Sequence, residues 1–267
     1  MSHLLLATSI FKLGPDATGT SRFFAEMVGT AILILFGDGV VAAVLLAKSK
    51  AENAGWIVIT AGWAFAVAIA VYATAAYSGA FINPAVAIAW AVTDQPGPPN
   101  WGQLWYYIAG ELLGAMIGAT LVYLAYYGHW KETEDPGLKL AVFSTGPAIR
   151  NTVQNLTTEI IGTIALVFGV LAIINHFASG TLAGAVVGNG FVPLIIGFLV
   201  WVIGLSLGGP TGYAINPARD LGPRIMHAVL PIPGKGTSDW NYAWIPVVGP
   251  IIGGIIGAAL FNLFYPG

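Results

Sequence analysis

The feature that most constrains this chain is a short motif that occurs twice. The copies cover residues 79–85 and 212–218, and both read Gly, two variable residues, Ile, then Asn-Pro-Ala. Their asparagines, Asn83 and Asn216, are 133 residues apart (216 − 83). Asn is a common helix N-cap and Pro suits the first helical position. Each copy therefore predicts a helix that begins directly after its asparagine.

The surrounding sequence is that of a membrane protein. Of its 267 residues 57% are hydrophobic and only 8% are charged, whereas soluble domains carry about 25% charged residues. A helix needs about 20 mostly apolar residues to span a bilayer. Six stretches qualify: 22–47, 56–77, 102–127, 155–176, 190–208 and 242–265. We read residues 1–21 as an N-terminal tail and residues 128–154 as a loop.

Two further apolar pieces are too short to span. They follow the two asparagines and cover residues 83–93 and 216–230. At 1.5 Å per residue, the first piece reaches only about half of a ~30 Å hydrocarbon core, and the second about three quarters of it. We therefore predict half-helices that enter the membrane and turn back, a backbone tolerated there only inside protein or beside water.

An internal repeat relates the two halves of the chain. Residues 26–30 (Glu-Met-Val-Gly-Thr) match residues 159–163 (Glu-Ile-Ile-Gly-Thr), and each glutamate precedes its asparagine by 57 residues (83 − 26 and 216 − 159). Each half, 22–127 and 155–265, has three spans and one half-helix. Because three is odd, the second half enters from the opposite face. The predicted fold is all-α, with six spans and two half-helices in an inverted repeat that forms one pore domain, 22–265.

With both motifs in this frame, residues 22–265 resemble the aquaporin superfamily. Arg219-Asp220 directly after the second motif resembles the glycerol-facilitator branch, as do Arg224 and Pro246. One position departs from the family pattern: Phe81 stands where members usually carry His. That exchange removes a polar side chain and argues against a pH gate at this point.

The resemblance implies a selectivity filter of Trp63, Gly204, Tyr213 and Arg219. Gly204 replaces the His of water channels and is expected to leave room for a carbon chain. Trp63 and Tyr213 would contact the C–H edge of a polyol, and Arg219 would donate to its hydroxyls. Glycerol facilitators usually have Phe at the position of Tyr213. We expect the added hydroxyl to affect selectivity by pointing into the pore; the alternative is that it lies behind the wall.

The resemblance also implies the remaining pore residues. The Asn-Pro-Ala motifs are Asn83, Pro84, Ala85, Asn216, Pro217 and Ala218. Extended segments before them would line the pore with free carbonyls, from Gly79, Ala80, Phe81, Ile82, Gly212, Tyr213, Ala214 and Ile215. The asparagine amides would supply donors. Buried Glu26 and Glu159 would hold these loops by accepting backbone N–H bonds, unless they only join helices.

Facing half-helix N-termini, each carrying about +0.5 charge, would repel protons and cations. We therefore expect passive diffusion of glycerol and related small neutral solutes, with some water. A broader or water-preferring pore would also pass dihydroxyacetone, urea or protonated small acids. A secondary transporter also uses inverted repeats, but Asp38 and Glu111 are the only further acids in the spans. Asp38 is read as pairing across a helix or marking a subunit contact.

Other classes of function find little in the sequence. A net charge of −2 gives no case for nucleic-acid binding. Without cysteine no thiol-ligated metal is possible, and no nucleophile–base pair or metal cluster suggests an enzyme. We expect no cofactor and no metal. The four histidines are read as loop or interface residues: His3, His129, His176 and His227. The glycosylation sequon at Asn155 gets little weight because it starts a helix.

Location and assembly follow from the resemblance. It implies a multi-pass protein of the plasma membrane, with both termini in the cytoplasm, that forms a homotetramer in the lipid bilayer. The loop charges point the other way. The first and third connections hold more basic residues than the N-terminal tail, which by the positive-inside rule would place the N-terminus outside.

Overall fold

Six long apolar helices dominate the chain. The computed structural model describes residues 18–95, 97–178 and 188–266. Within these ranges the helices are α2 (Gly19–Leu45), α3 (Trp56–Ser78), α4 (Pro84–Val92), α5 (Leu104–Ala125), α6 (His129–Glu132), α7 (Pro136–Phe143), α8 (Thr152–Ala178), α9 (Gly188–Leu207), α10 (Pro217–Val229) and α11 (Ile245–Phe264). Helices α2, α3, α5, α8, α9 and α11 are long and apolar enough to cross a bilayer. These six spans and both half-helices, α4 and α10, begin and end within three residues of the predicted limits.

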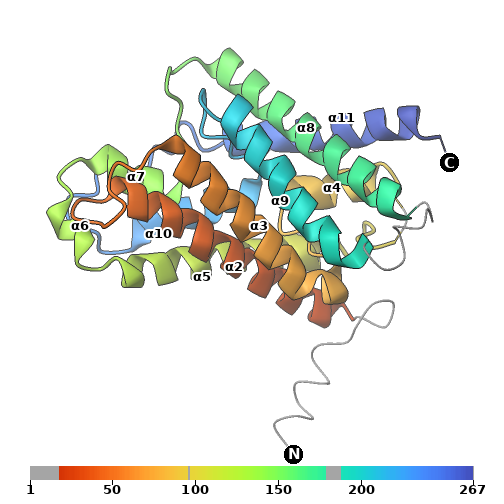
Figure 1. The fold of residues 1–267 in the computed structure, drawn as a ribbon, viewed down its shortest axis with the longest axis horizontal. Helices are drawn as coiled ribbons and strands as arrows, with labels where there is room; N and C mark the ends of the chain where they lie inside the picture. The colour runs from red at the N-terminus through yellow and green to blue at the C-terminus, as the bar shows by residue number, and fades with distance from the viewer. Residues whose placement is uncertain (1–17, 96, 179–187, 267) are drawn as a thin grey trace, which may run out of the picture.

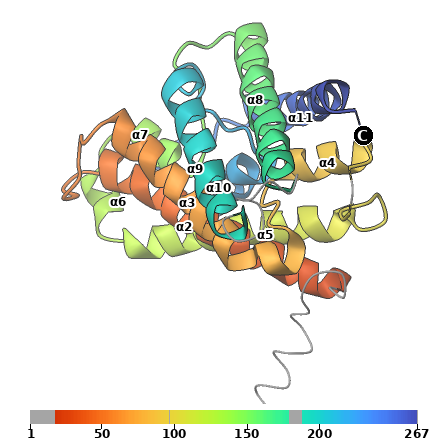
Figure 2. The same cartoon turned by 45° about the vertical axis from the view of Figure 1, so that its right-hand side comes forward.

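The helices pack in the same pattern in both halves. α2 lies against α5 and α3, and in the second half α8 lies against α11 and α9. The two half-helices are exchanged, since α4 packs on α11 and α10 packs on α5. Figure 1 shows the order of the helices along the chain, and in Figure 2 α4 lies between α11 and α5. The predicted inverted arrangement of half-helices is thereby confirmed.

Glycines allow the strongest of these contacts. A Cβ on Gly114 of α5 would lie 2.2 Å from the backbone oxygen of Met27 on α2. In the second half, a Cβ on Gly253 of α11 would lie 2.4 Å from the backbone oxygen of Ile160 on α8. Met27 and Ile160 are equivalent in the repeat (160 − 27 = 133). Close backbone approach through small residues is how helices associate in lipid.

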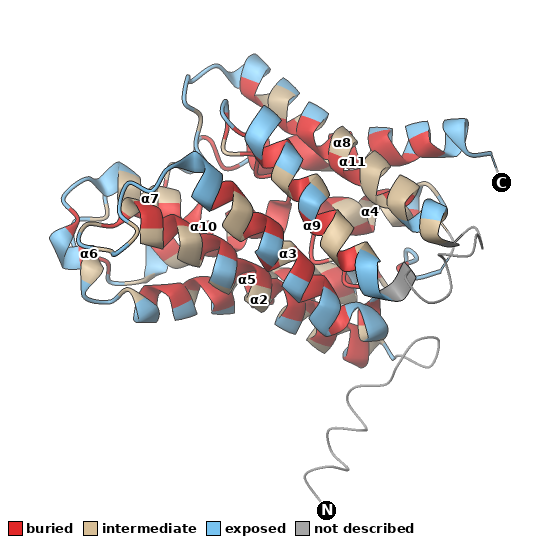
Figure 3. Cartoon of the chain, viewed as in Figure 1, coloured by how far each residue is buried: buried red, intermediate tan, exposed pale blue. Residues whose placement is uncertain are grey.

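Burial separates the two faces of the long helices. Figure 3 shows buried residues facing the centre of the bundle and exposed residues facing outward. The outward face carries large apolar side chains such as Phe65, Ile69 and Phe198. An apolar exterior of this kind is expected where lipid, rather than water, surrounds the protein.

Two boundaries differ from those predicted. α2 begins at Gly19 with Thr18 as its cap, so residues 18–21 belong to the first span and not to a tail; residues 1–17, with His3, lie outside the described part. Residues 128–154 are not a plain loop, because they form α6 and α7 and the start of α8. Asp135 caps α7 by accepting a bond from the Gly137 N–H at 2.7 Å, and Pro136 starts it.

Candidate functional site

The two asparagines of the repeated motif lie face to face at the centre of the bundle. Asn83 Nδ2 donates to the Ile215 carbonyl at 2.8 Å, and Asn216 Nδ2 donates to the Ile82 carbonyl at 2.7 Å. Each asparagine oxygen caps its own half-helix, accepting from the N–H of Ala85 or Ala218 at 3.0 Å. Each amide therefore ties one re-entrant loop to the other and still holds a second hydrogen.

The sequence analysis predicted extended loops before the half-helices. The structure contradicts this prediction. Gly79, Ala80 and Ile82 have φ values of 92°, 52° and 46°. The second loop repeats this, with positive φ at Gly212, Tyr213 and Ile215. The left-handed region is costly for a non-glycine residue, by about 1–3 kcal/mol each. Such backbone persists only where its surroundings fix it.

Carboxylates hold both loops in this conformation. Glu26 accepts from the N–H groups of Phe81 at 3.0 Å and Ile82 at 2.6 Å. Glu159 accepts from those of Ala214 at 3.0 Å and Ile215 at 2.8 Å. Hydrogen bonds to a charged acceptor are worth about 1.5–3 kcal/mol each, which is enough to offset the strain.

Two further partners of these loops were not predicted. Glu111 accepts from the Asn83 N–H at 2.9 Å, and Thr211 donates its hydroxyl to Glu159 at 2.7 Å. Gly110 and Gly249 pack in the same way on Glu26 and Glu159. Gly110 is followed by Glu111, whereas Gly249 is followed by Pro250, so the second half has no acidic counterpart. The only signal for Glu111 was an acid inside an apolar span, which demands a fixed partner.

With these bonds made, part of the loop backbone is left free. The carbonyls of Ile82 and Ile215 accept the asparagine amides. Within the described part of the chain, the carbonyls of the six other predicted pore residues accept no backbone hydrogen bond. These are Gly79, Ala80, Phe81, Gly212, Tyr213 and Ala214. Such carbonyls can accept hydrogen bonds from a polar solute.

Two cavities meet beside the second loop. The larger, about 610 Å³, extends from Arg22 and Tyr77 past both asparagines to Arg219. The smaller, about 290 Å³, lies on the side of the connection after α7 and is lined by residues 144–148. Three residues line both cavities: Trp63, Tyr213 and Arg219. The path through the bundle is therefore divided at these three side chains.

Arg219 is held from two sides at this division. Its guanidinium carbon lies 4.0 Å from the centre of the Trp63 ring, a cation–π contact. Its Nη1 lies 3.4 Å from the Phe143 carbonyl, to which it donates, and 3.5 Å from Oδ1 of Asp38. Only 6% of Arg219 is exposed.

Gly204 makes room for Tyr213 and not for a solute. A Cβ on Gly204 would lie 2.8 Å from the Tyr213 Cζ and 2.9 Å from Thr60. The Tyr213 hydroxyl is enclosed there and has no hydrogen-bond partner in the described part of the chain. This corrects two expectations, since the hydroxyl lies behind the wall and the space beside Gly204 is filled. Trp56, which the sequence did not single out, donates to the Gly204 carbonyl at 3.0 Å and meets the Tyr213 ring edge to face.

Phe81 makes the far part of the larger cavity apolar. Its ring meets Trp90 at 5.2 Å and Tyr107 at 5.3 Å between centres, both edge to face. Tyr107 turns its hydroxyl to the Ser78 carbonyl at 3.0 Å. The residue therefore belongs to an aromatic cluster at the first loop.

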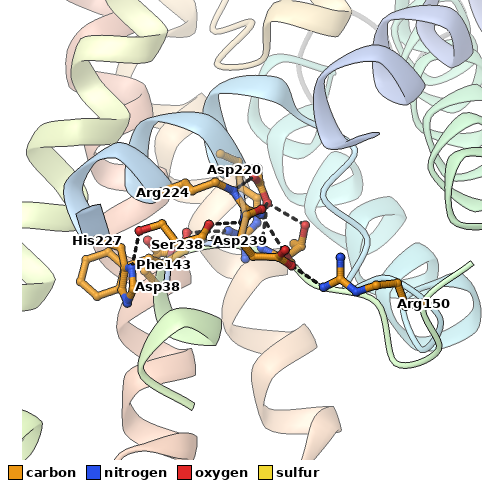
Figure 4. A network of polar contacts seen from close by, with 10 residues as sticks. Asp38, Phe143, Arg150, Asp220, Arg224, His227, Ser238 and Asp239 are labelled. Carbon is orange, nitrogen blue, oxygen red and sulfur yellow. Dashed lines mark hydrogen bonds and ion pairs between the residues drawn. The ribbon is translucent and has the colours of Figure 1, made fainter. Parts of the chain in front are cut away.

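Asp220 and Arg224 join the segments beside the second half-helix (Figure 4). Arg224 donates to both Asp220 oxygens, at 2.8 and 3.0 Å, and to the carbonyls of Thr145, Ser238 and Asp239. Asp220 also accepts from the N–H and hydroxyl of Thr145. All five guanidinium hydrogens are thus used. Pro246, the remaining marker, lies in the first turn of α11.

One of the described histidines, His227, does not lie in a loop or interface as predicted. His227, predicted in a loop or interface, is fully buried near the end of α10, and its Nδ1 lies 2.9 Å from the Ser238 hydroxyl. His129 Nδ1 lies 2.9 Å from the Ala47 carbonyl, and His176 is in the last turn of α8. The Asn155 side chain is buried too, donating to Ile149, which leaves no room for a glycan.

The fold, the facing half-helices and the divided path define a membrane channel of the aquaporin type. The chain belongs to the major intrinsic protein family, whose pattern it matches over residues 16–261. It is 58% identical over 245 residues to a probable glycerol uptake facilitator of Thermotoga maritima, covering 92% of this chain and 100% of that protein. It is 53% identical over 249 residues to a glycerol uptake facilitator of Bacillus subtilis, covering 92% and 86%.

A solved structure has the same fold. The X-ray structure of the aquaglyceroporin from Plasmodium falciparum superposes with a TM-score of 0.78 at 25% identity, covering 92% of this chain and 96% of that one. The recognition of an aquaporin-like, multi-pass membrane protein is thereby confirmed. It is a member of a channel family and not of an enzyme family.

Proposed function

We propose that the protein is a passive channel for glycerol and related small neutral solutes, with some passage of water. The division of the path at Trp63, Tyr213 and Arg219 carries the proposal. The aromatic rings offer an apolar face to C–H groups, and the guanidinium offers donors to hydroxyls. A polyol has one face of each kind. The names of the two relatives as glycerol uptake facilitators support the same substrate.

Each part of the site then has a role. Trp63, Tyr213 and Arg219 form the filter, and Gly204 positions the Tyr213 ring. The free carbonyls on both loops replace the water that a solute leaves behind, because an unsatisfied polar group costs several kcal/mol. The amides of Asn83 and Asn216 donate at the centre, and the two half-helix N-termini exclude cations. Two repeats, 22–127 and 155–265, build this single pore domain.

We also propose the setting of the channel. The apolar exterior fits a lipid bilayer, and the family resemblance favours a homotetramer in the plasma membrane with both termini in the cytoplasm. On that assignment the connection after α7 faces outside, and the larger cavity opens toward the cytoplasm.

Swelling and shrinking of proteoliposomes tests the function. Vesicles with the protein should pass glycerol much faster than protein-free vesicles, and longer polyols progressively more slowly. Glycerol flux should rise linearly with its gradient and ignore ion gradients, which a coupled transporter would not do. Fast water entry with glycerol at the protein-free rate would disprove the glycerol assignment. Equal passage of urea and glycerol would favour a broader pore.

A further inference from the structure

The first spanning helix carries a buried carboxylate close to the filter. Asp38 is in α2, and its exposed fraction is 0%. Neither of its carboxylate oxygens has a hydrogen-bond partner among the described residues. Burying a charge in this way costs several kcal/mol unless an opposite charge is near. The charge nearest to it is therefore informative.

That charge is the guanidinium of Arg219. Oδ1 of Asp38 lies 3.5 Å from Arg219 Nη1, and both side chains are buried. Figure 4 shows Asp38 on the side of the network nearest Phe143, away from Arg150. The two residues are 181 positions apart (219 − 38) and come from the first span of one repeat and the half-helix of the other.

No other carboxylate among the described residues serves Arg219. Asp220 is its neighbour in sequence, but the oxygens of Asp220 accept from Thr145 and Arg224. Within the portions of the chain that the structure describes, Asp38 is the one acid within 4.0 Å of the Arg219 nitrogens. These two acids and two arginines, all buried, thus form two separate pairs, Asp220 with Arg224 and Asp38 with Arg219.

The same turn of α2 also packs against Trp63, an aromatic residue of the filter. A Cβ on Gly37 would lie 2.2 Å from the Trp63 ring, so the ring rests on the backbone at Gly37. The guanidinium of Arg219 in turn rests on that ring, 4.0 Å from its centre. Gly37 and Asp38 are adjacent, so one turn of α2 contacts both Trp63 and Arg219 of the constriction.

We propose that Asp38 is the counter-ion and positioning residue of Arg219: it holds the guanidinium against Trp63, neutralises its charge and so sets the selectivity of the filter. The inference rests on the proposed function, because it takes Trp63 and Arg219 as the constriction. A neutral pair can donate to hydroxyls without trapping an anion. Exclusion of cations then falls mainly to the half-helix N-termini, which carry about +0.5 charge each.

The first test replaces the charge while keeping the shape, with Asp38→Asn. Arg219 then loses its ionic partner, and its guanidinium can swing into the path. The ratio of glycerol to water permeability should fall about threefold or more, since displacing a binding group by about 1 Å can cost up to 100-fold. Leak of small anions such as nitrate should rise, because the filter gains a net positive charge. Asp38→Glu keeps the charge and should retain the wild-type ratio within about twofold.

Asp239→Asn is the matched control. It makes the same exchange at an acid that pairs with Arg150 at the surface, 2.5 Å away. Its permeability ratio and anion leak should equal those of the wild type. Because the ratio compares two solutes in one channel, it does not depend on how much folded protein is present.

A double variant tests whether Asp38 acts through Arg219. Arg219→Gln alone should lower the glycerol-to-water ratio, and adding Asp38→Asn should lower it no further. If Asp38→Asn lowers the glycerol-to-water ratio by the same factor in the Arg219→Gln background as in the wild type, Asp38 does not act through Arg219. That result would overturn the proposal. So would a wild-type ratio in Asp38→Asn, or equal losses in Asp38→Asn and Asp38→Glu. If Asp38→Asn does not fold, the comparison of Arg219→Gln with the double variant still decides.

The two proposals fail in different ways. Wild-type protein that passes no glycerol would remove the proposed function. Wild-type protein that passes glycerol, with Asp38→Asn unchanged in ratio and leak, would remove only the assignment of Asp38.

Discussion

The Tyr213 ring occupies the space that a side chain at position 204 would fill, so its position depends on Gly204 having no side chain. We predict that Gly204→Ala lowers glycerol permeability several-fold, more than it lowers water permeability. The added Cβ would lie 2.8 Å from Tyr213 Cζ, a distance that forces the ring toward the path. Overpacking of this kind costs about 1–3 kcal/mol. Stopped-flow light scattering on proteoliposomes measures both permeabilities.

The control for this exchange is Gly39→Ala in α2. A Cβ on Gly39 meets nothing within 4 Å, so the same added methyl should leave both permeabilities unchanged. If Gly204→Ala leaves both permeabilities unchanged, as expected for Gly39→Ala, the contact between Gly204 and Tyr213 does not set the width of the filter.

His227 predicts how stability depends on pH. It lies outside the six spanning helices, and burial, with the positive charges of Lys235 and Arg224 nearby, lowers its pKa from 6.5 to about 4. Between these values the unfolded chain binds a proton that the folded chain does not. The free energy of unfolding should therefore fall on acidification from pH 6.5 toward 4, by up to about 1.4 kcal/mol per pH unit.

The comparison is with His227→Gln, because carboxylates also titrate in this window. Thermal unfolding midpoints in detergent should decline more steeply for the wild type than for the variant between pH 6.5 and 4.5, a window inside that set by the cited pKa values. Parallel declines would show that His227 does not carry this dependence.

At this scale the sequence supplied the residues of the repeat but not their partners from elsewhere. Asn83, Asn216, Glu26 and Glu159 could be placed because a fixed spacing links each pair. Asp38 has no equivalent in the second half, so no spacing pointed to Arg219. Which helix faces another across the bundle depends on side-chain packing, which a single sequence does not display.

Among the elements, the re-entrant loops differ most from what propensity suggests. β-Branched residues disfavour positive φ, yet Ile82 and Ile215 have φ of 46° and 44°. No sequence rule would assign isoleucine to that conformation. The loops adopt it because a buried carboxylate accepts two consecutive N–H groups, a contact made only once the first span of each repeat is in place.

Glu159→Gln should destabilise the second loop. The amide nitrogen of Gln cannot accept, so one acceptor for Ala214 or Ile215 is lost. The unfolding free energy should drop by roughly 1.5–3 kcal/mol, the worth of a hydrogen bond to a charged group. Thermal unfolding in detergent would register this as a lower midpoint.

Glu134→Gln serves as the reference for that variant, since Glu134 is exposed in the connection between α6 and α7. It should unfold like the wild type. Equal midpoints for all three proteins would mean that the loop does not depend on the charge of Glu159.

Helices α6 and α7 illustrate the other limit of the sequence. They are too short and too weakly apolar to register as spans, so residues 128–154 read as a loop. The Asp135-Pro136 pair is a helix-start signal in its own right. Reading every N-cap, not only those before apolar runs, would have found α7.

In the whole molecule, the two repeats are joined by their half-helices, each of which packs against the other repeat, as well as by the connecting chain. Each half-helix packs on the third span of the other repeat, α4 on α11 and α10 on α5. Each asparagine of the motif donates to the loop of the opposite repeat. Neither repeat alone can satisfy these groups, and an unpaired polar group within a bilayer costs several kcal/mol.

Cutting the chain before α8 tests this interdependence. Fragments 1–150 and 151–267 should each be unstable in membranes and conduct no glycerol when made alone. Made together they should assemble and restore glycerol swelling, because every contact that joins the repeats apart from one peptide bond is retained. Chromatography of the co-purified pair and the proteoliposome assay report assembly and conduction. A single fragment that is stable and conducts would show that the exchanged half-helices are not required, and that one repeat can close a pore by pairing with a second copy of itself.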